Sequence, residues 1–153
     1  MLFRSKREIN KMLNKEVSRR GVFCGVALLA VGLTAEKAEA AVPATGITQV
    51  GNKLKVDLTK NKALSKVGGV VQIDLSDGSS IAIVRAAAGN KGLIALSLSC
   101  THNGVTVMQQ GSGWICPAHG SQFGLNGKLI QGPARSALQK YPITATSKFA
   151  MIG

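Results

Sequence analysis

Short apolar segments separated by turn residues dominate the chain from residue 53 onward. Residues 54–58 alternate apolar and polar side chains, which is the period-2 pattern of a half-buried strand. Residues 70–75 and 80–85 are apolar segments on either side of Asp77-Gly78, a dipeptide that is typical of hairpin turns. The pattern therefore predicts a β-hairpin over residues 70–85.

Four more segments complete the predicted strands. Residues 93–98 are apolar and lead directly into Cys100, and residues 148–152 are predicted as a closing strand. Residues 106–108 and 114–115 flank a turn rich in Gly and Gln and predict a small hairpin. Many short strands, with no helix of ten residues after residue 40, predict an all-β fold built as an antiparallel sandwich or barrel.

Residues 1–40 follow a different pattern, which indicates a targeting segment and not a part of the fold. A long basic region ends in Ser-Arg-Arg-Gly (18–21), which resembles a twin-arginine export signal. An uncharged stretch follows, and Ala38-Glu39-Ala40 gives the small-x-small pattern of a cleavage site. We expect export with cleavage there; the alternative is an amphipathic surface helix with a chance pair of arginines.

The uncharged stretch also bears on membrane attachment. Residues 21–35 would span about 22 Å as a helix, whereas the hydrocarbon core of a bilayer is about 30 Å thick. Cleavage is therefore favoured over a permanent anchor, although residues 1–40 would allow membrane association if they remained attached. Cys24 lies in this segment and would be lost with it.

Length and charge constrain the number of domains and the partners of residues 41–153. The 153 residues suit one domain, with 41–52 as a linker and first strand and 45–153 as the folded domain. Residues 41–153 hold eleven Lys and Arg against three Asp, a net charge of +8. The lysines at 53–66 are expected to form a solvated face, with an acidic partner or an anionic membrane surface as the alternative. Nucleic acid is not an expected partner after export.

Both histidines and two of the three cysteines of the chain lie in one short stretch. They form two pairs, Cys100-x-His102 and Cys116-x-x-His119, each followed closely by a glycine. Thiolate and imidazole are the ligands that iron–sulfur and zinc sites prefer. The pairs therefore predict a metal centre held by two loops.

The sequence around these pairs resembles a known family. Cys-Thr-His-Asn-Gly (100–104) and Cys-Pro-Ala-His-Gly-Ser (116–121) resemble the two cluster-binding boxes of Rieske iron–sulfur proteins, and residues 132–143 resemble the family's proline loop and the strand after it. The resemblance implies a Rieske-type antiparallel β-sandwich or barrel. It also implies a small cluster-binding subdomain of two loops at about residues 98–134.

The resemblance implies one 2Fe–2S cluster, with Cys100 and Cys116 on one iron and His102 and His119 on the other. Neutral imidazoles in place of two thiolates make the cluster less negative, which raises its reduction potential. In the family the histidine edges face solvent, so electrons would enter and leave there. Their remaining N–H groups would release protons on oxidation, which would couple electron transfer to proton transfer.

Four positions concern the reduction potential and the class of Rieske protein. Quinol-oxidising members carry an additional cysteine in each box, and Val105 and Ala118 stand at those positions, so that disulfide cannot form. Ser121 matches a serine that donates to a cluster sulfur, whereas Phe123 stands where high-potential members have Tyr. We expect a potential in the middle of the Rieske range of about −150 to +300 mV. The alternative role for Ser121 is the capping of a turn.

Together these features predict an exported electron-transfer protein, either a soluble carrier or the small subunit of a periplasmic oxidoreductase. Its partner would be a cytochrome or a larger oxidoreductase subunit, at the periplasm or on the outer face of the cytoplasmic membrane. No substrate site is predicted on this chain. The alternatives are the Rieske subunit of a quinol–cytochrome c reductase and a zinc-stabilised structural module. In an oxidising compartment Cys100 and Cys116 could also pair as a disulfide.

Overall fold

The computed structural model describes residues 41–153, which belong to one compact unit. The predicted export signal, its cleavage site and Cys24 lie outside the described residues. Within residues 41–153, no helix is long and apolar enough to cross a bilayer. The described part consists of short strands and two 3₁₀ turns, η1 (Lys62–Ser65) and η2 (Asn90–Gly92). The predicted all-β fold is confirmed.

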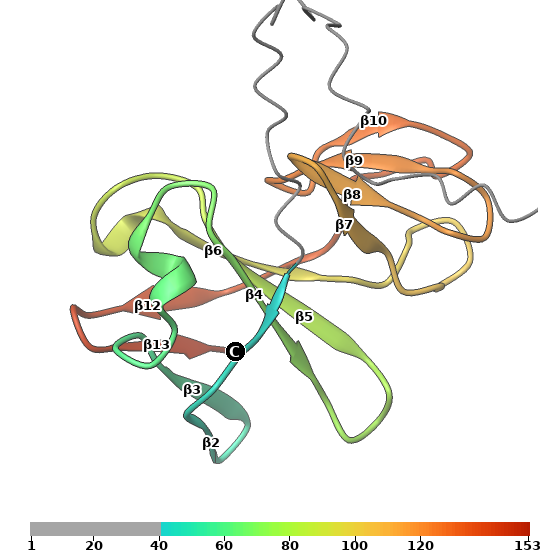
Figure 1. The fold of residues 1–153 in the computed structure, drawn as a ribbon. Helices are drawn as coiled ribbons and strands as arrows, with labels where there is room; N and C mark the ends of the chain where they lie inside the picture. The colour runs from blue at the N-terminus through green and yellow to red at the C-terminus, as the bar shows by residue number, and fades with distance from the viewer. Residues whose placement is uncertain (1–40) are drawn as a thin grey trace, which may run out of the picture. The chain divides into compact units, whose positions relative to one another are not determined.

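A five-stranded sheet occupies the middle of the unit (Figure 1). Its strands pair antiparallel except for β1, which runs parallel to β4. The hairpin predicted over residues 70–85 forms its centre, where Ile73 pairs with Ile81. In spatial order the strands are β1 (Val42–Pro43), β4 (Val70–Asp74), β5 (Ser80–Arg85), β6 (Leu93–Ser97) and β11 (Lys140–Tyr141).

Two four-stranded antiparallel sheets accompany the central one. The first contains the predicted strands at 54–58 and 148–152; its spatial order is β12 (Ile143–Ala145), β13 (Phe149–Ile152), β3 (Lys53–Asp57) and β2 (Ile47–Val50). The second carries the candidate ligand loops; its order is β10 (Leu129–Gln131), β9 (Gln122–Gly124), β8 (Gly113–Ile115) and β7 (Met108–Gln110).

The central sheet is buried on both faces, which explains its continuous apolar strands. Alternate residues along each strand point to opposite faces. One set, including Val84 and Leu96, joins a core with Trp114 and Phe123 of the ligand-loop sheet. The other set, including Ile83 and Ala95, joins a second core with Val56 and Ile152 of the first four-stranded sheet. The unit is thus layered, with the central sheet between the other two.

The small hairpin predicted at residues 106–115 is present, but its turn is shorter than expected. Gln109 pairs with Trp114 and Gln110 with Gly113, so the ladder extends into the glutamines and leaves only Gly111 and Ser112 between the strands. Gly111 takes φ +57°, which glycine adopts at little cost. Both glutamines lie on β7, an edge strand; Gln110 is exposed, whereas the side-chain oxygen of Gln109 is buried and has no hydrogen-bond partner among the described residues.

Candidate metal centre

The two loops that carry the cysteine–histidine pairs have the same backbone design. In the first loop, Cys100 N–H donates to the carbonyl of Val105 and Cys100 O accepts from Gly104 N–H, at 2.9 and 2.8 Å. In the second loop, Cys116 N–H donates to Ser121 O and Cys116 O accepts from Gly120 N–H, at 2.8 and 2.9 Å.

Each loop therefore closes by hydrogen bonds from the cysteine to the residues four and five positions later. The residue at the fourth position needs a positive φ, and it is glycine in both loops, with +74° at Gly104 and +72° at Gly120. Strands β6 and β7 flank the first loop, and strands β8 and β9 flank the second. The first loop thus joins the central sheet to the ligand-loop sheet, and the second joins two neighbouring strands of the ligand-loop sheet, yet both loops close with the same hydrogen-bond pattern.

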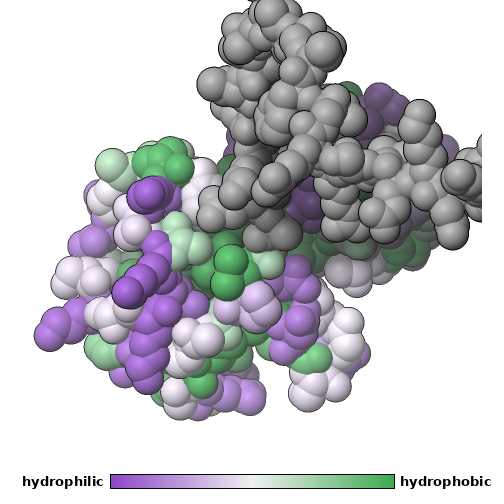
Figure 2. All heavy atoms as spheres, in the orientation of Figure 1, coloured by the Kyte–Doolittle hydropathy of each residue, from purple (hydrophilic) through white to green (hydrophobic). Residues whose placement is uncertain are grey.

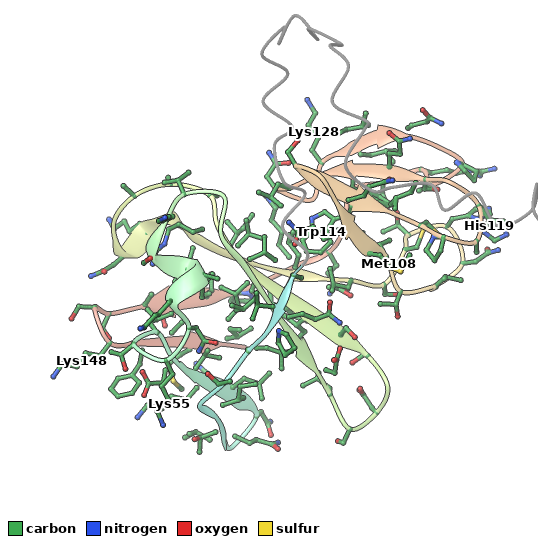
Figure 3. The ribbon with its side chains drawn as sticks, viewed as in Figure 1. Lys55, Met108, Trp114, His119, Lys128 and Lys148 are labelled. Atoms are coloured by element: carbon green, nitrogen blue, oxygen red, sulfur yellow. The ribbon has the colours of Figure 1, made fainter. Side chains whose placement is uncertain are left out.

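The four predicted residues meet as two pairs. Cys100 and Cys116 are buried, 2% and 1% exposed, and both are free thiols. His102 and His119 are exposed, and their Nδ1 atoms lie 3.3 Å apart with the rings edge to face. Among residues 41–153, no three His, Cys, Asp or Glu side chains surround one point as ligands of a single ion. Figure 3 shows His119 at the far edge of the unit, beyond strand β7.

The surroundings of the second cysteine favour a thiolate. Burial by itself raises the pKa of Cys116, but the backbone N–H groups of His119 and Ala118 and the side chain of Cys100 lower it by more, so the net pKa is below that of an ordinary thiol. N–H donors that point at sulfur stabilise its negative charge. Because a thiolate is the form that binds metal, this loop is prepared for a metal ligand.

A loop from further along the chain holds both ligand loops in place. Ser121 is fully buried, and its Oγ accepts a hydrogen bond of 3.0 Å from the N–H of Ala134. Thr101 Oγ1 donates to the carbonyl of Ser136 at 2.7 Å. Residues 134–136 therefore contact both loops, where the resemblance predicts the proline loop. The role of Thr101 was not predicted from the sequence, although its hydroxyl, directly beside the candidate ligand Cys100, was a signal for such a hydrogen bond.

Ser121 retains a hydroxyl proton that the protein does not use. Its oxygen accepts from Ala134, and within residues 41–153 the hydroxyl has no acceptor of its own. Phe123 is 1% exposed and offers no donor at all. Trp114 is 2% exposed in the same core and donates its Nε1–H to Leu125 O at 3.3 Å.

The residues present fit a 2Fe–2S cluster of mixed ligation. Two buried sulfurs and two exposed imidazoles would be enough to supply two ligands to each of two irons. The unused donor of Ser121 and the N–H groups near Cys116 suit a group that carries negative charge on sulfur. The donor chemistry and the burial therefore agree with the cofactor that the sequence predicts.

One cavity of the described part lies away from the candidate ligands. Its volume is about 980 Å³, and residues from β1, η1 and β7, among them Val42, Lys62 and Gln109, line it. None of the four candidate ligands lines this cavity. The exposed histidines face solvent directly, which suits contact with a partner protein better than enclosure of a small substrate.

Comparisons with known proteins agree with the site. A family model described as the Rieske [2Fe-2S] domain matches residues 55–142, more than half of the chain. The cytochrome b6-f complex iron-sulfur subunit of Prochlorococcus marinus is 46% identical over 55 residues, which cover 35% of this chain and 29% of that protein. The ubiquinol-cytochrome c reductase iron-sulfur subunit of Rickettsia typhi is 43% identical over 54 residues, 33% of this chain and 30% of that protein.

A solved structure is also similar. The plasma-membrane Rieske protein PetC3 of the cyanobacterium Synechocystis is 27% identical, with a TM-score of 0.46 over 56% of this chain and 86% of that chain. The chain spans less than a third of the length of the curated relatives named above. The family match covers both ligand loops, the ligand-loop sheet β7–β10 and the central hairpin β4–β5. This chain therefore belongs to the Rieske [2Fe-2S] domain family.

Proposed function

We propose that Cys100 and Cys116 hold one iron of the cluster and that His102 and His119 hold the other. The observation that carries this assignment is the meeting of four residues from two loops as a buried sulfur pair and an exposed imidazole pair. The bound cluster supplies one-electron chemistry. The buried cysteines keep its inner edge away from water, and the exposed histidines give a partner access to the other edge.

We propose that residues 45–153 form the Rieske domain and that residues 98–134 form its cluster-binding subdomain. The support is that both ligand loops and the sheet β7–β10 lie within the second range. In this arrangement Ser121 donates its free hydroxyl proton toward the cluster. With one donor at Ser121 and none at Phe123, a potential in the middle of the family's range of about −150 to +300 mV is expected.

The chain is a Rieske iron–sulfur electron-transfer protein, and its specific role is our proposal. We infer that it is exported and acts as a soluble carrier or as the small subunit of a periplasmic oxidoreductase. Val105 and Ala118 support this role, because a disulfide between the loops is absent at the positions where quinol-oxidising members have it. The partner would be a cytochrome or a larger redox subunit, and its surface would meet His102 and His119.

A second candidate role is that of the Rieske subunit of a quinol–cytochrome c reductase. The support is that the relatives at 42–46% identity are named as subunits of cytochrome b6-f and ubiquinol-cytochrome c reductase complexes. In that role a histidine edge would bind the quinol. Fractionation separates the two roles: co-purification with a cytochrome b from washed membranes supports the second, and recovery in the periplasmic fraction supports the first.

Low-temperature EPR on the dithionite-reduced full chain tests the cofactor and its ligands. A rhombic Rieske signal with two irons and two sulfides per chain is expected. An EPR-silent protein with one zinc per chain would refute the assignment and make the Cys–His pairs structural.

Export is tested separately, by replacing Arg19 and Arg20 with Lys and following the protein between cytoplasm and periplasm. Retention in the cytoplasm is the expected result for that variant.

A further inference from the structure

The first four-stranded sheet has an outer face that combines lysines with apolar side chains. Residues paired across antiparallel strands point to the same face. Val50 pairs with Lys53, and Lys55 pairs with Met151, while the alternate residues Val56 and Ile152 are buried in the core. We define the outer face by Val50, Lys53, Lys55, Asp57, Phe149 and Met151, with Lys148 directly before β13.

Lysines outnumber the single carboxylate of this face, Asp57, which pairs with Phe149. Lys53 and Lys148 are exposed, and Lys55 Nζ lies 4.0 Å from the centre of the Phe149 ring. Further exposed lysines follow on the segment that holds η1, at positions 60, 62 and 66. Figure 2 shows hydrophilic residues gathered over this part of the unit. Each of the three carboxylates of residues 41–153 accepts side-chain hydrogen bonds from neutral residues. Asp57 accepts from Thr59, Asp74 from Gln72 and Ser80, and Asp77 from Ser79.

The apolar members distinguish this face from an ordinary solvated one. Val50 is 49% exposed, and the side chains of Phe149 and Met151 are half-buried on the solvent side of the sheet. A solvated face needs charge but does not need an aromatic ring and a thioether between its lysines. Lysines interspersed with partly exposed apolar side chains match the boundary between anionic headgroups and acyl chains.

The layering of the fold argues against a redox partner on this face. One face of the central sheet packs against the first four-stranded sheet, and the other face packs against the ligand-loop sheet. Sheets in contact lie about 10 Å apart, so two such layers place the outer face on the order of 20 Å from the ligand loops. Figure 3 shows Lys55 and Lys148 at the opposite end of the unit from His119. A protein bound at the lysines would be poorly placed to exchange electrons.

We propose that the outer face binds an anionic lipid surface and that the histidine end remains free for the redox partner. That the histidine end stays free for a redox partner rests on the proposed role of His102 and His119. Lipid binding itself requires only the charge and the apolar side chains of the outer face. The protein would then be held at a membrane by its own folded domain, whether or not residues 1–40 are retained.

Co-sedimentation of the full chain with vesicles tests the proposal. The vesicles contain 30% phosphatidylglycerol in phosphatidylcholine, with pure phosphatidylcholine as the uncharged reference. The triple variant K53Q/K55Q/K148Q is expected to bind the anionic vesicles about 100-fold more weakly than wild type, because each lysine near an anionic surface contributes about fivefold. The matched control K91Q/K128Q/K140Q removes the same charge from exposed lysines outside the outer face and should stay within about threefold of wild type.

Residues 1–40 are basic and contribute to binding in every variant, so a site-specific readout accompanies the affinity. Lysine acetylation followed by mass spectrometry should show protection of Lys53, Lys55 and Lys148 on anionic vesicles, with Lys128 and Lys140 still reactive. Equal losses of affinity in both triple variants, or no protection of the three lysines, would overturn the proposal. Binding to polyglutamate without binding to anionic vesicles would overturn it in favour of an acidic protein. The EPR signal of the cluster is independent of all these outcomes.

Discussion

His102 and His119 approach each other through their Nδ1 atoms at 3.3 Å, although 17 positions separate them in the chain. Their rings meet edge to face, with centroids 4.7 Å apart and an interplanar angle of 87°. Two neutral imidazoles can share one hydrogen bond there only if one of them carries its proton on Nδ1. Two Nδ1 atoms directed into one small region also suit a pair of ligands to one iron, which is the role we propose for them.

The His119→Cys variant tests that pair directly. A third thiolate would make the cluster more negative, so we expect the reduction potential to fall toward the value of about −400 mV typical of all-cysteine clusters. Redox titration followed by EPR measures the change. His102→Cys should behave alike, and the surface variant Lys91→Gln provides the control. An intact Rieske spectrum with an unchanged potential in His119→Cys would show that this residue is not a ligand.

Ser121→Ala should lower both the potential and the stability. The variant loses a donor toward the cluster, which at roughly 1.5–3 kcal/mol for a hydrogen bond to a charged group corresponds to a fall of roughly 60–130 mV. It also leaves the buried N–H of Ala134 without its acceptor, which costs about 1–3 kcal/mol of unfolding free energy. Protein-film voltammetry and denaturant unfolding measure the two effects.

Thr101→Val is the matched control for Ser121→Ala. It removes the other hydrogen bond to the same loop, from Thr101 Oγ1 to the carbonyl of Ser136. Because that hydroxyl is already engaged as a donor, we expect about 1 kcal/mol of lost stability and an unchanged potential. Equal falls in potential for both variants would mean that loop position, and not the Ser121 hydroxyl, sets the potential.

Gly127→Ala should destabilise the fold more than Gly78→Ala. Both glycines have φ near +80°, so alanine pays a similar backbone cost of about 1–2 kcal/mol at either position. At Gly127 the new methyl group would also lie 2.9 Å from Leu96 Cδ2, whereas at Gly78 nothing lies within 4 Å. Overpacking costs about 1–3 kcal/mol more. Thermal unfolding followed by circular dichroism should rank the variants in this order, and equal melting temperatures would contradict the packing at Leu96.

Asp74 is expected to contribute stability that disappears in acid. Hydrogen bonds from Gln72 and then Ser80 hold the pKa of its carboxyl below the ordinary value of 3.8. A carboxyl with a lowered folded-state pKa stabilises the protein above its unfolded-state pKa, and the contribution is lost as the pH falls through the folded-state pKa.

Asp74→Asn removes this titration. The difference in melting temperature between wild type and this variant should therefore be greatest near neutral pH and should close below about pH 4. Ser76→Ala, in the adjacent turn, serves as the reference for a change without a titrating group. A constant difference between Asp74→Asn and wild type from pH 7 to pH 3 would contradict the assigned hydrogen bonds.

The sequence by itself determined those features that depend on local pattern. Alternation within residues 54–58 and the apolar segments at 70–85 predicted strands that the structure confirms. The burial of a strand face determines whether each residue and its neighbours are apolar or polar, so the local sequence shows it. The spacing of the two Cys–His pairs likewise predicted the metal centre. Strands β9, β10 and β12 were not predicted, because they are only three residues long and show no complete period, and a strand at β11 was expected only from the family resemblance of residues 132–143.

Tertiary structure alone decided which distant residues meet. Ser121 reaches Ala134 across 13 positions and Thr101 reaches Ser136 across 35, and no local pattern encodes either contact. The layering of the sheets also decided that the lysines of β3 share a face with Phe149, at the opposite end from the histidines. The physical reason is that local sequence sets the faces of each strand, whereas the packing of these faces into common cores sets which strands become neighbours.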